Sequence, residues 1–255
     1  MFALERQAKI AALVASERRA AVPAIAEQFD VSEATVRRDL VVLERAGKLK
    51  RTHGGAVHVG VLAREISIDV RSRANAEAKD VIGRLAAQLV DPDDTIMLDA
   101  ATTTLAMVGH LQGVANLRAV TSGVRTAQAL GAVPGAGVYL CGGELRASTL
   151  SITGHQAEEF VRSYYADKLF LSARAISAEA GIMDFSEADA RIKQTMIERS
   201  ATKVLLVDSS KFDARAFIQI ARLDQVDLLV TDKRPDAALA AALDAAGVKV
   251  VAPTG

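Results

Sequence analysis

The feature that constrains this chain most is a segment between residues 31 and 55, which contains VSEATVRRDL (31–40) and KLKRTHGG (48–55). If a helix begins at Ser32, the spacing places on its inward face Val36, Leu40 and Leu43. The outward face is then short-chained and cationic. Small side chains allow a helix to approach the floor of the DNA major groove, and Arg and Thr donate to base edges and phosphates. The segment predicts a recognition helix followed by a basic wing.

The residues before this segment complete the motif. Residues 22–29 predict a short helix with Ile25 and Phe29 inward, and Asp30 and Val31 predict a tight turn. Further upstream, a first helix is indicated by Leu4, Ile10, Leu13 and Val14. Three helices and a hairpin make a winged helix-turn-helix domain.

The candidate DNA contacts are the outward residues of the helix and the wing. They are Ser32, Ala34, Thr35, Arg37, Arg38, Arg45, Lys48, Lys50, Arg51, His53, Gly54 and Gly55. An isolated Arg-Arg pair more often only solvates a surface helix, but here the preceding helix and the wing favour DNA. For His53, a phosphate contact and a structural hydrogen bond fit the sequence equally well.

Charge and composition agree with a duplex-binding protein. The chain has 31 Lys and Arg against 31 Asp and Glu, yet residues 1–60 hold ten against seven, and six of those ten cations lie in residues 37–51. The single Cys141 leaves no disulfide within one chain and no Cys-based zinc cluster. Neither a signal peptide nor a membrane span is recognisable, so we expect a cytoplasmic protein. Aromatic residues are sparse, which disfavours stacking on single strands.

Residues 1–57 and 75–255 form the natural division into two domains, with 58–74 as a connector. In the second part, apolar runs of strand length recur without in-out alternation, at 95–98, 117–120, 138–141, 168–171, 204–207, 228–230 and 248–251. Segments with helical patterning lie between them, at 76–90, 102–111, 155–165, 188–200 and 235–246. Strands that are apolar on both faces belong to a sheet covered on both sides, so an open α/β sheet is predicted.

Polar and glycine-rich loops follow several of these strands. Such loops are DAATTT (99–104), TSG (121–123), CGGELR (141–146) and DSSKF (208–212). In open α/β sheets the ligand lies beyond the carboxyl ends of the strands, where hydroxyls and free N–H groups can hold an anion. Each loop alone has a plain alternative, since Thr residues cap helices and Gly residues form turns. Their recurrence at successive strand ends favours an anion site.

These motifs resemble the DeoR family of bacterial transcription regulators. The resemblance rests on 31–40 and RTHGGA (51–56) in the first domain, and on 98–104, 119–122, 141–146, 187–193 and 208–212 in the second. It spans nearly the whole chain. It implies a winged helix-turn-helix domain joined to a sugar-phosphate-sensing domain, whose fold is similar to ribose-5-phosphate isomerase and the CoA transferases.

The resemblance also implies effector contacts. They are Asp99, Thr102, Thr103, Thr121, Ser122, Gly142, Gly143, Lys193, Asp208 and Lys211. The chain departs from the family in two places: Ala101 stands where Gly is usual, and SARA (172–175) replaces a GADG-like stretch. Arg174 therefore reverses a charge. It either adds a contact to a second anionic group or fills the pocket, and we include it among the effector-binding candidates.

We therefore expect a regulator, most simply a repressor of sugar or related carbon catabolism genes. It would bind double-stranded operator DNA as a homodimer or homotetramer and be released by a phosphorylated sugar, without cofactor or metal. The rival is a sugar-phosphate isomerase-like enzyme with an appended DNA-binding domain, using Asp99, Glu187 and Lys193. A third class is a nucleoid-type scaffold that ignores metabolites. No Ser-His-Asp spacing, Walker loop or metal-ligand spacing is present, so a non-enzyme is favoured.

Overall fold

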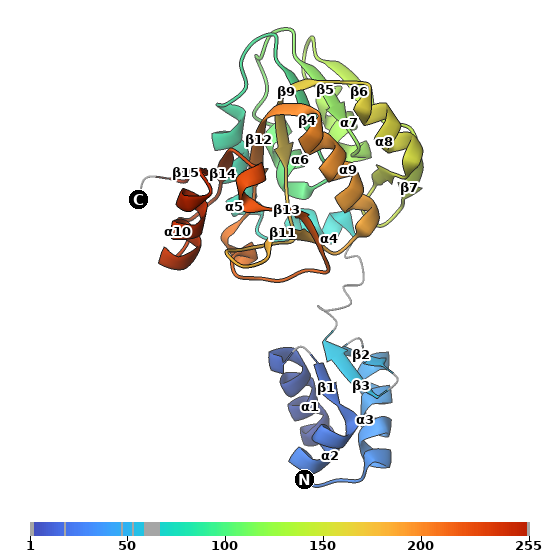
Figure 1. Ribbon diagram of the computed structural model, residues 1–255. Helices are drawn as coiled ribbons and strands as arrows, with labels where there is room; N and C mark the ends of the chain where they lie inside the picture. The colour runs from blue at the N-terminus through green and yellow to red at the C-terminus, as the bar shows by residue number, and fades with distance from the viewer. Residues whose placement is uncertain (1–2, 18, 47, 53, 59–66, 254–255) are drawn as a thin grey trace. The chain divides into compact units, whose positions relative to one another are not determined.

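The chain divides into two compact units, residues 1–65 and 66–255 (Figure 1). The computed structural model describes residues 3–17, 19–46, 48–52, 54–58 and 67–253. The first unit is a winged helix-turn-helix and the second an open α/β sheet, so the predicted fold class is confirmed.

The N-terminal unit contains three helices and a small antiparallel sheet of order β1-β3-β2. Its elements are α1 (Ala3–Glu17), β1 (Arg19–Ala21), α2 (Val22–Phe29), α3 (Glu33–Arg45), β2 (Leu49–Thr52) and β3 (Gly55–His58). The strands β2 and β3 form the predicted wing. Strand β1, which no pattern in the sequence indicated, pairs with β3.

Local chemistry fixes the turn between α2 and α3. Asp30 ends α2 in the left-handed conformation, at φ 50°, and Ser32 caps α3 by accepting a hydrogen bond from the backbone N–H of Thr35 at 3.2 Å. The inward faces then meet in one core, in which Val36 and Leu40 are fully covered. This packing turns the opposite face of α3 to solvent.

The C-terminal unit is built on a seven-stranded sheet of order β15-β14-β12-β9-β4-β5-β6, in which every neighbouring pair is parallel. The strands are β4 (Thr95–Leu98), β5 (Arg118–Thr121), β6 (Gly137–Leu140), β9 (Ala166–Leu171), β12 (Ser200–Leu206), β14 (Leu228–Val230) and β15 (Lys249–Val251). All seven predicted apolar runs are therefore strands of one sheet.

Helices cover both faces of this sheet (Figure 1). They are α5 (Ala76–Ala87), α6 (Thr102–Val108) and α7 (Val124–Leu130) on one face, and α8 (His155–Arg162), α9 (Glu187–Glu198) and α10 (Ala237–Ala245) on the other. In β4, Ile96 and Leu98 pack in the core beneath α5, α6 and α7, and Met97 packs in the core beneath α8, α9 and α10. The runs lack alternation because each face of the sheet is buried.

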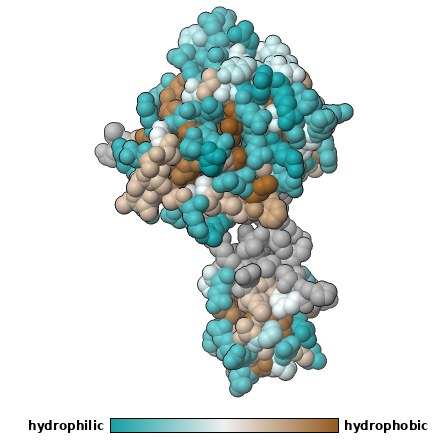
Figure 2. Space-filling view, in the orientation of Figure 1, coloured by the Kyte–Doolittle hydropathy of each residue, from teal (hydrophilic) through white to brown (hydrophobic). Residues whose placement is uncertain are grey.

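Shorter elements surround the sheet. They are α4 (Ile68–Arg73), β7 (Glu144–Arg146), β8 (Ser151–Thr153), β10 (Ala175–Ser177), β11 (Gly181–Asp184), β13 (Ile218–Ala221) and the 3-10 turns η1 (Ser209–Lys211) and η2 (Leu223–Gln225). Strands β10, β11 and β13 form one antiparallel sheet, and β7 pairs with β8. On the face drawn in Figure 2, polar residues predominate, as expected for covered cores. No helix of the described residues is long and apolar enough to span a membrane.

The order of the strands creates a switch point between β4 and β9. From β4 the chain moves outward through β5 to β6, then returns to β9 on the other side of β4 and continues to β15. The loops after β4 and β9 therefore lead to helices on opposite faces and leave a crevice between them, which is where such folds bind ligands.

The last part of the segment predicted as a partly ordered connector, 58–74, contains a helix. Residues 68–73 form α4, which belongs to the C-terminal unit and buries Ile68. The polar residues around Ile68 hid this short helix, because a single buried side chain gives no period.

Candidate functional site

The outward face of α3 carries the predicted DNA contacts. Ser32, Ala34, Arg37 and Arg38 are exposed, as is Lys48 before the wing, while Thr35 is half-buried. Arg37 forms an ion pair with Glu33 at 2.8 Å along the helix surface. The side chain of Arg38 lies on the exposed face, so both arginines can reach a nucleic acid without disturbing the core.

The wing is described only in part. His53 and the side chains of Arg45, Lys50 and Arg51 lie outside the described residues. Gly54 is exposed, but Gly55 is buried, and a Cβ there would lie 2.2 Å from the carbonyl oxygen of Ala20. The close approach of β1 and β3 therefore explains why glycine stands at position 55, without any contact to DNA.

A polar pocket, partly open to solvent, lies at the switch point of the larger sheet. Its lining comes from the loops after β4, β5 and β9, from β8, β11 and α9, and from α4. The lining residues are Arg71, Asp99, Ala100, Ala101, Ser122, Thr149, Ser151, Arg174, Asp184, Asp189, Ile192 and Lys193.

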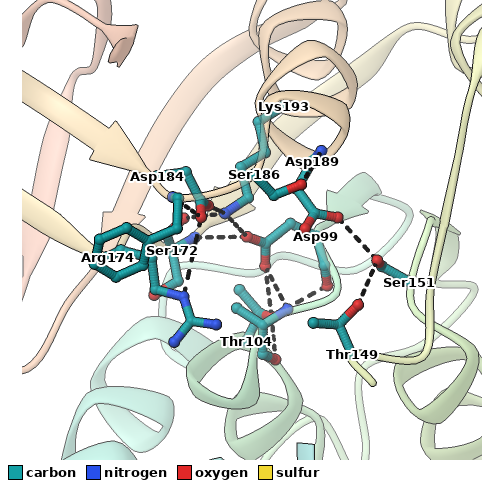
Figure 3. A network of polar contacts seen from close by, with 12 residues as sticks. Asp99, Thr104, Thr149, Ser151, Ser172, Arg174, Asp184, Ser186, Asp189 and Lys193 are labelled. Atoms are coloured by element: carbon teal, nitrogen blue, oxygen red, sulfur yellow. Dashed lines mark hydrogen bonds and ion pairs between the residues drawn. The ribbon is translucent and has the colours of Figure 1, made fainter. Parts of the chain in front are cut away.

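The carboxylate of Asp99, at the end of β4, is held on both sides (Figure 3). One oxygen accepts from the backbone N–H of Ala101 at 3.1 Å and from the hydroxyl of Thr104 at 2.8 Å. The other accepts from the N–H of Ser172, after β9, at 3.0 Å and lies 3.2 Å from the ammonium of Lys193. Asp99 therefore ties together the two strands that flank the switch point.

Lys193 projects from α9 into the same cluster. Its ammonium donates to Asp184 at 2.6 Å and to the carbonyl of Ser172 at 2.7 Å. Burial alone would lower the pKa of Lys193, but the carboxylates of Asp184 and Asp99 raise it above the usual lysine value. Burial alone would raise the pKa of Asp184, but the charge of Lys193 lowers it. Both groups stay charged.

A second polar group closes the opposite wall. Asp189, one helical turn before Lys193 on α9, accepts from the hydroxyl of Ser151 at 2.8 Å and forms an ion pair with Arg146. Ser151 in turn is 2.8 Å from the hydroxyl of Thr149. Figure 3 shows Asp189, Ser151 and Thr149 beside the Asp99 cluster.

Two guanidinium groups face this pocket with few partners. Arg174 has Asp184 at 3.9 Å, while the guanidinium of Arg71 makes no hydrogen bond or ion pair with any residue the structure describes. Burial lowers the pKa of Arg71 to about 10, and the charge of Arg174 adds to this effect. Two positive charges therefore lie within electrostatic range of each other at a partly buried site, and a bound anion would reduce the repulsion between them.

Two lysines lie within electrostatic range of both arginines. Burial lowers the pKa of Lys79 to about 8, and the charges of Arg71, Lys211 and Arg174 contribute. Burial also lowers the pKa of Lys211, again with contributions from Arg174 and Arg71. Asp208 partly offsets both.

Of the predicted effector contacts, the structure brings four into the pocket lining: Asp99, Ser122, Arg174 and Lys193. Lys211 lies within electrostatic range, and Asp208 accepts hydrogen bonds in its own turn and from Asn75. Thr102, Thr103, Thr121, Gly142 and Gly143 do not line the pocket.

The residues outside the lining have local explanations. The hydroxyl of Thr121 accepts from the N–H of Gly123 at 3.0 Å, a local turn before α7, whose N-cap is Gly123 and has no side-chain cap. Thr102 and Thr103 are buried in the first turn of α6. Gly143 has φ 145°, and a Cβ there would lie 2.6 Å from the carbonyl of Thr153, whereas Gly142 is exposed.

Sequence reasoning missed several lining residues, above all Arg71, Thr149, Ser151, Asp184 and Asp189. One of them had a usable signal: Asp189 precedes Lys193 by four residues, so a helix places both on one face. The others come from short elements whose convergence depends on the tertiary fold.

Among the described residues, no group of His, Cys, Asp and Glu could hold a metal ion. Glu187, the carboxylate considered for the isomerase alternative, is exposed and pairs with Arg191 at 2.7 Å, away from the lining. What the pocket offers instead is charge and hydroxyl groups.

Comparison with known proteins decides the family. Residues 6–60 match the DeoR-like helix-turn-helix domain, and residues 74–233 match the DeoR C terminal sensor domain. The HTH-type transcriptional regulator GolR of Listeria innocua is 34% identical over 250 residues, covering 98% of both chains. The HTH-type transcriptional repressor GlcR of Bacillus subtilis is 35% identical over 251 residues, covering 98% of this chain and 96% of the relative.

The chain belongs to the DeoR family of transcriptional regulators. Among solved structures, ribose 5-phosphate isomerase A of Methanocaldococcus jannaschii is similar at a TM-score of 0.40, with 13% identity, over 55% of each chain.

Anion binding by this DeoR-family regulator should depend on pH through Lys79. Because an anion favours charged neighbours, the affinity for sulfate should fall severalfold as the pH rises through about 8, where Lys79 loses its proton. Sulfate has no titration of its own in this range. Calorimetric titration between pH 7 and 9 measures the effect.

The matched variant is Lys79→Gln, in which the charge is absent at every pH. It should bind sulfate weakly, with a flatter pH profile. Equal affinity of the unmodified protein at pH 7 and pH 9 would contradict the assignment.

Proposed function

We propose that this regulator is a repressor of genes for the use of a sugar or related carbon source, and that a phosphorylated sugar in the pocket releases it from operator DNA. The names of its relatives support repression, and the pocket supports the ligand class. DNA binding belongs to the N-terminal unit and effector binding to the C-terminal unit.

The observation that carries the proposal is the pair of guanidinium groups from Arg71 and Arg174. With Lys79, Lys193, Lys211 and Arg146, this end of the sheet has six cationic side chains. Its four carboxylates are those of Asp99, Asp184, Asp189 and Asp208. The carboxylates of Asp99, Asp184 and Asp189 are already engaged by Lys193 and Arg146. Positive charge is left over, and planar guanidinium groups suit a phosphate.

The remaining lining suits the hydroxyls of a sugar. Ser122, Thr149 and Ser151 supply hydroxyl groups, and the carboxylates of Asp99 and Asp189 supply acceptors. A site with cations at one end and such groups at the other fits a small molecule that is both phosphorylated and polyhydroxylated.

Two of the charged groups that line the pocket are poorly suited to proton transfer. Proton transfer needs a base or acid whose pKa lies near the working pH. Lys193 keeps its proton because two carboxylates raise its pKa, and the pKa of Asp184 is lowered, so neither is poised to exchange a proton. A binding site, by contrast, is served well by groups with fixed charge.

Useful affinity for DNA requires more than one copy of the chain. A single module of this kind buries only about 600–1,000 Å² on DNA, and dimers place two recognition helices on half-sites about 34 Å apart. We therefore propose a homodimer or homotetramer, with the other DNA contacts as predicted from the sequence.

Replacing Arg38 tests the DNA-binding surface. Since its side chain is exposed on α3, Arg38→Ala should weaken binding to a duplex from upstream of the chain's own gene by roughly 1–3 kcal/mol. Fluorescence anisotropy at fixed salt measures this. The matched control is Arg84→Ala, an exposed arginine of α5 in the other unit, and equal affinity of both variants would exclude Arg38 from the interface.

Replacing Arg174 tests the effector pocket. Arg174→Met should retain DNA binding but require at least about tenfold more sugar phosphate for release, because a charged hydrogen bond contributes about 1.5–3 kcal/mol. The assay titrates the protein–DNA complex with a panel of monosaccharide phosphates and their unphosphorylated counterparts. Arg215→Met, an exposed arginine paired with Glu179, is the control. Release by unphosphorylated sugars alone would contradict the proposal.

A further inference from the structure

The helix α4 is both a wall of the pocket and the first element after the segment that joins the two units. Arg71 lies on α4 and lines the pocket. The N–H of Ile68, at the start of α4, donates to the carbonyl of Ser148 at 2.9 Å, and the next residue, Thr149, also lines the pocket. A ligand in the pocket therefore contacts α4 directly.

Few contacts hold α4 in place. Ile68 is buried, and Asp69 forms an ion pair with Arg125 of α7 on the surface. Surface ion pairs contribute little to stability. A six-residue helix is also too short to be stable by itself, so its position depends on these contacts.

The end of α4 is capped by a lysine that belongs to the cationic cluster. The buried ammonium of Lys79 donates to the carbonyls of Arg71 and Ala74, the latter at 2.6 Å. The charges of Lys79 and Arg71 therefore lie within electrostatic range of the charge of Arg174, and that of Lys79 also of Lys211. An anion held by Arg71 of α4 and Arg174 after β9 would join α4 to the opposite side of the pocket.

We propose that α4 reports occupancy of the pocket: an anionic group held by Arg71 and Arg174 fixes α4 against the C-terminal unit, and loss of the anion loosens it. This inference rests on the proposed function, since it needs an anion in that pocket. It assigns to α4 the step between effector binding and DNA release.

The expected change in the connection between the units is large enough to matter. Six helical residues span about 9 Å, whereas the same six residues released and extended span up to about 20 Å. Half-sites on DNA lie about 34 Å apart. Docking of α4 therefore shortens the reach available to paired DNA-binding units by a substantial part of that spacing.

Hydrogen exchange on the full chain tests the proposal, with inorganic phosphate as the probe. The N–H groups of Arg71 and Ala74 donate to Ser67 and Val70 within α4, and both should exchange at least tenfold more slowly when phosphate is saturating. The N–H groups of Ala240 and Ala246, at α10, serve as the internal reference and should not change. Calorimetry measures phosphate binding in parallel.

Two variants separate the pocket from the helix. Arg174→Met leaves the contacts of α4 intact and should lose both phosphate affinity and the slowing. Ile68→Ala leaves the pocket lining intact and removes the buried contact of α4, so it should speed exchange in α4 without phosphate, while phosphate restores protection. Phosphate binding with unchanged exchange in α4 would overturn this inference and leave the anion site standing. Absence of phosphate binding would overturn both.

Discussion

The buried ammonium of Lys193, between the carboxylates of Asp99 and Asp184, is the interaction on which the rest of the site depends. It joins α9 to the ends of β4 and β11 and, through the carbonyl of Ser172, to the end of β9. A buried charge without a partner would be strongly destabilising, so each of these groups needs the others. The switch point of the sheet is thereby closed by charge pairing.

This pairing also determines which charges remain for a ligand. Lys193 engages Asp99 and Asp184, and Arg146 engages Asp189, whereas Arg71 forms no hydrogen bond or ion pair with these carboxylates in the part of the chain that the structure describes. The structural cluster and the anion site are thus two parts of one charge arrangement. A regulator needs only about 1–3 kcal/mol of coupling between effector and DNA, which modest repulsion among a few cations can supply.

Much of the architecture could be predicted from the sequence because it depends on local patterns. The apolar runs such as 95–98 and 204–207 are buried on both faces, and the face of α3 follows from the spacing of Val36 and Leu40. Asp99 was predicted because it follows a strand and Lys193 because it lies on the helix after Glu187, and both belong to stretches that resemble the family. Of the predicted glycines, Gly55 and Gly143 are explained by close approach of neighbouring backbone.

The pocket residues that the sequence did not predict come from elements whose position depends on the tertiary fold. Arg71 stands in a segment without period, and it becomes a pocket residue only because a six-residue helix docks on the sheet. Asp184 and Ser151 lie on short antiparallel strands whose position depends on long-range packing. Arg174, which the sequence left with two roles, lines the pocket together with Arg71.

The most direct test of this account is the position of an anion in a crystal of the protein soaked in selenate, located by anomalous diffraction from selenium. We expect the selenium peak between the guanidinium groups of Arg71 and Arg174, with Lys193 still bonded to Asp184. A pocket without selenate, in crystals that bind the anion elsewhere, would contradict the account.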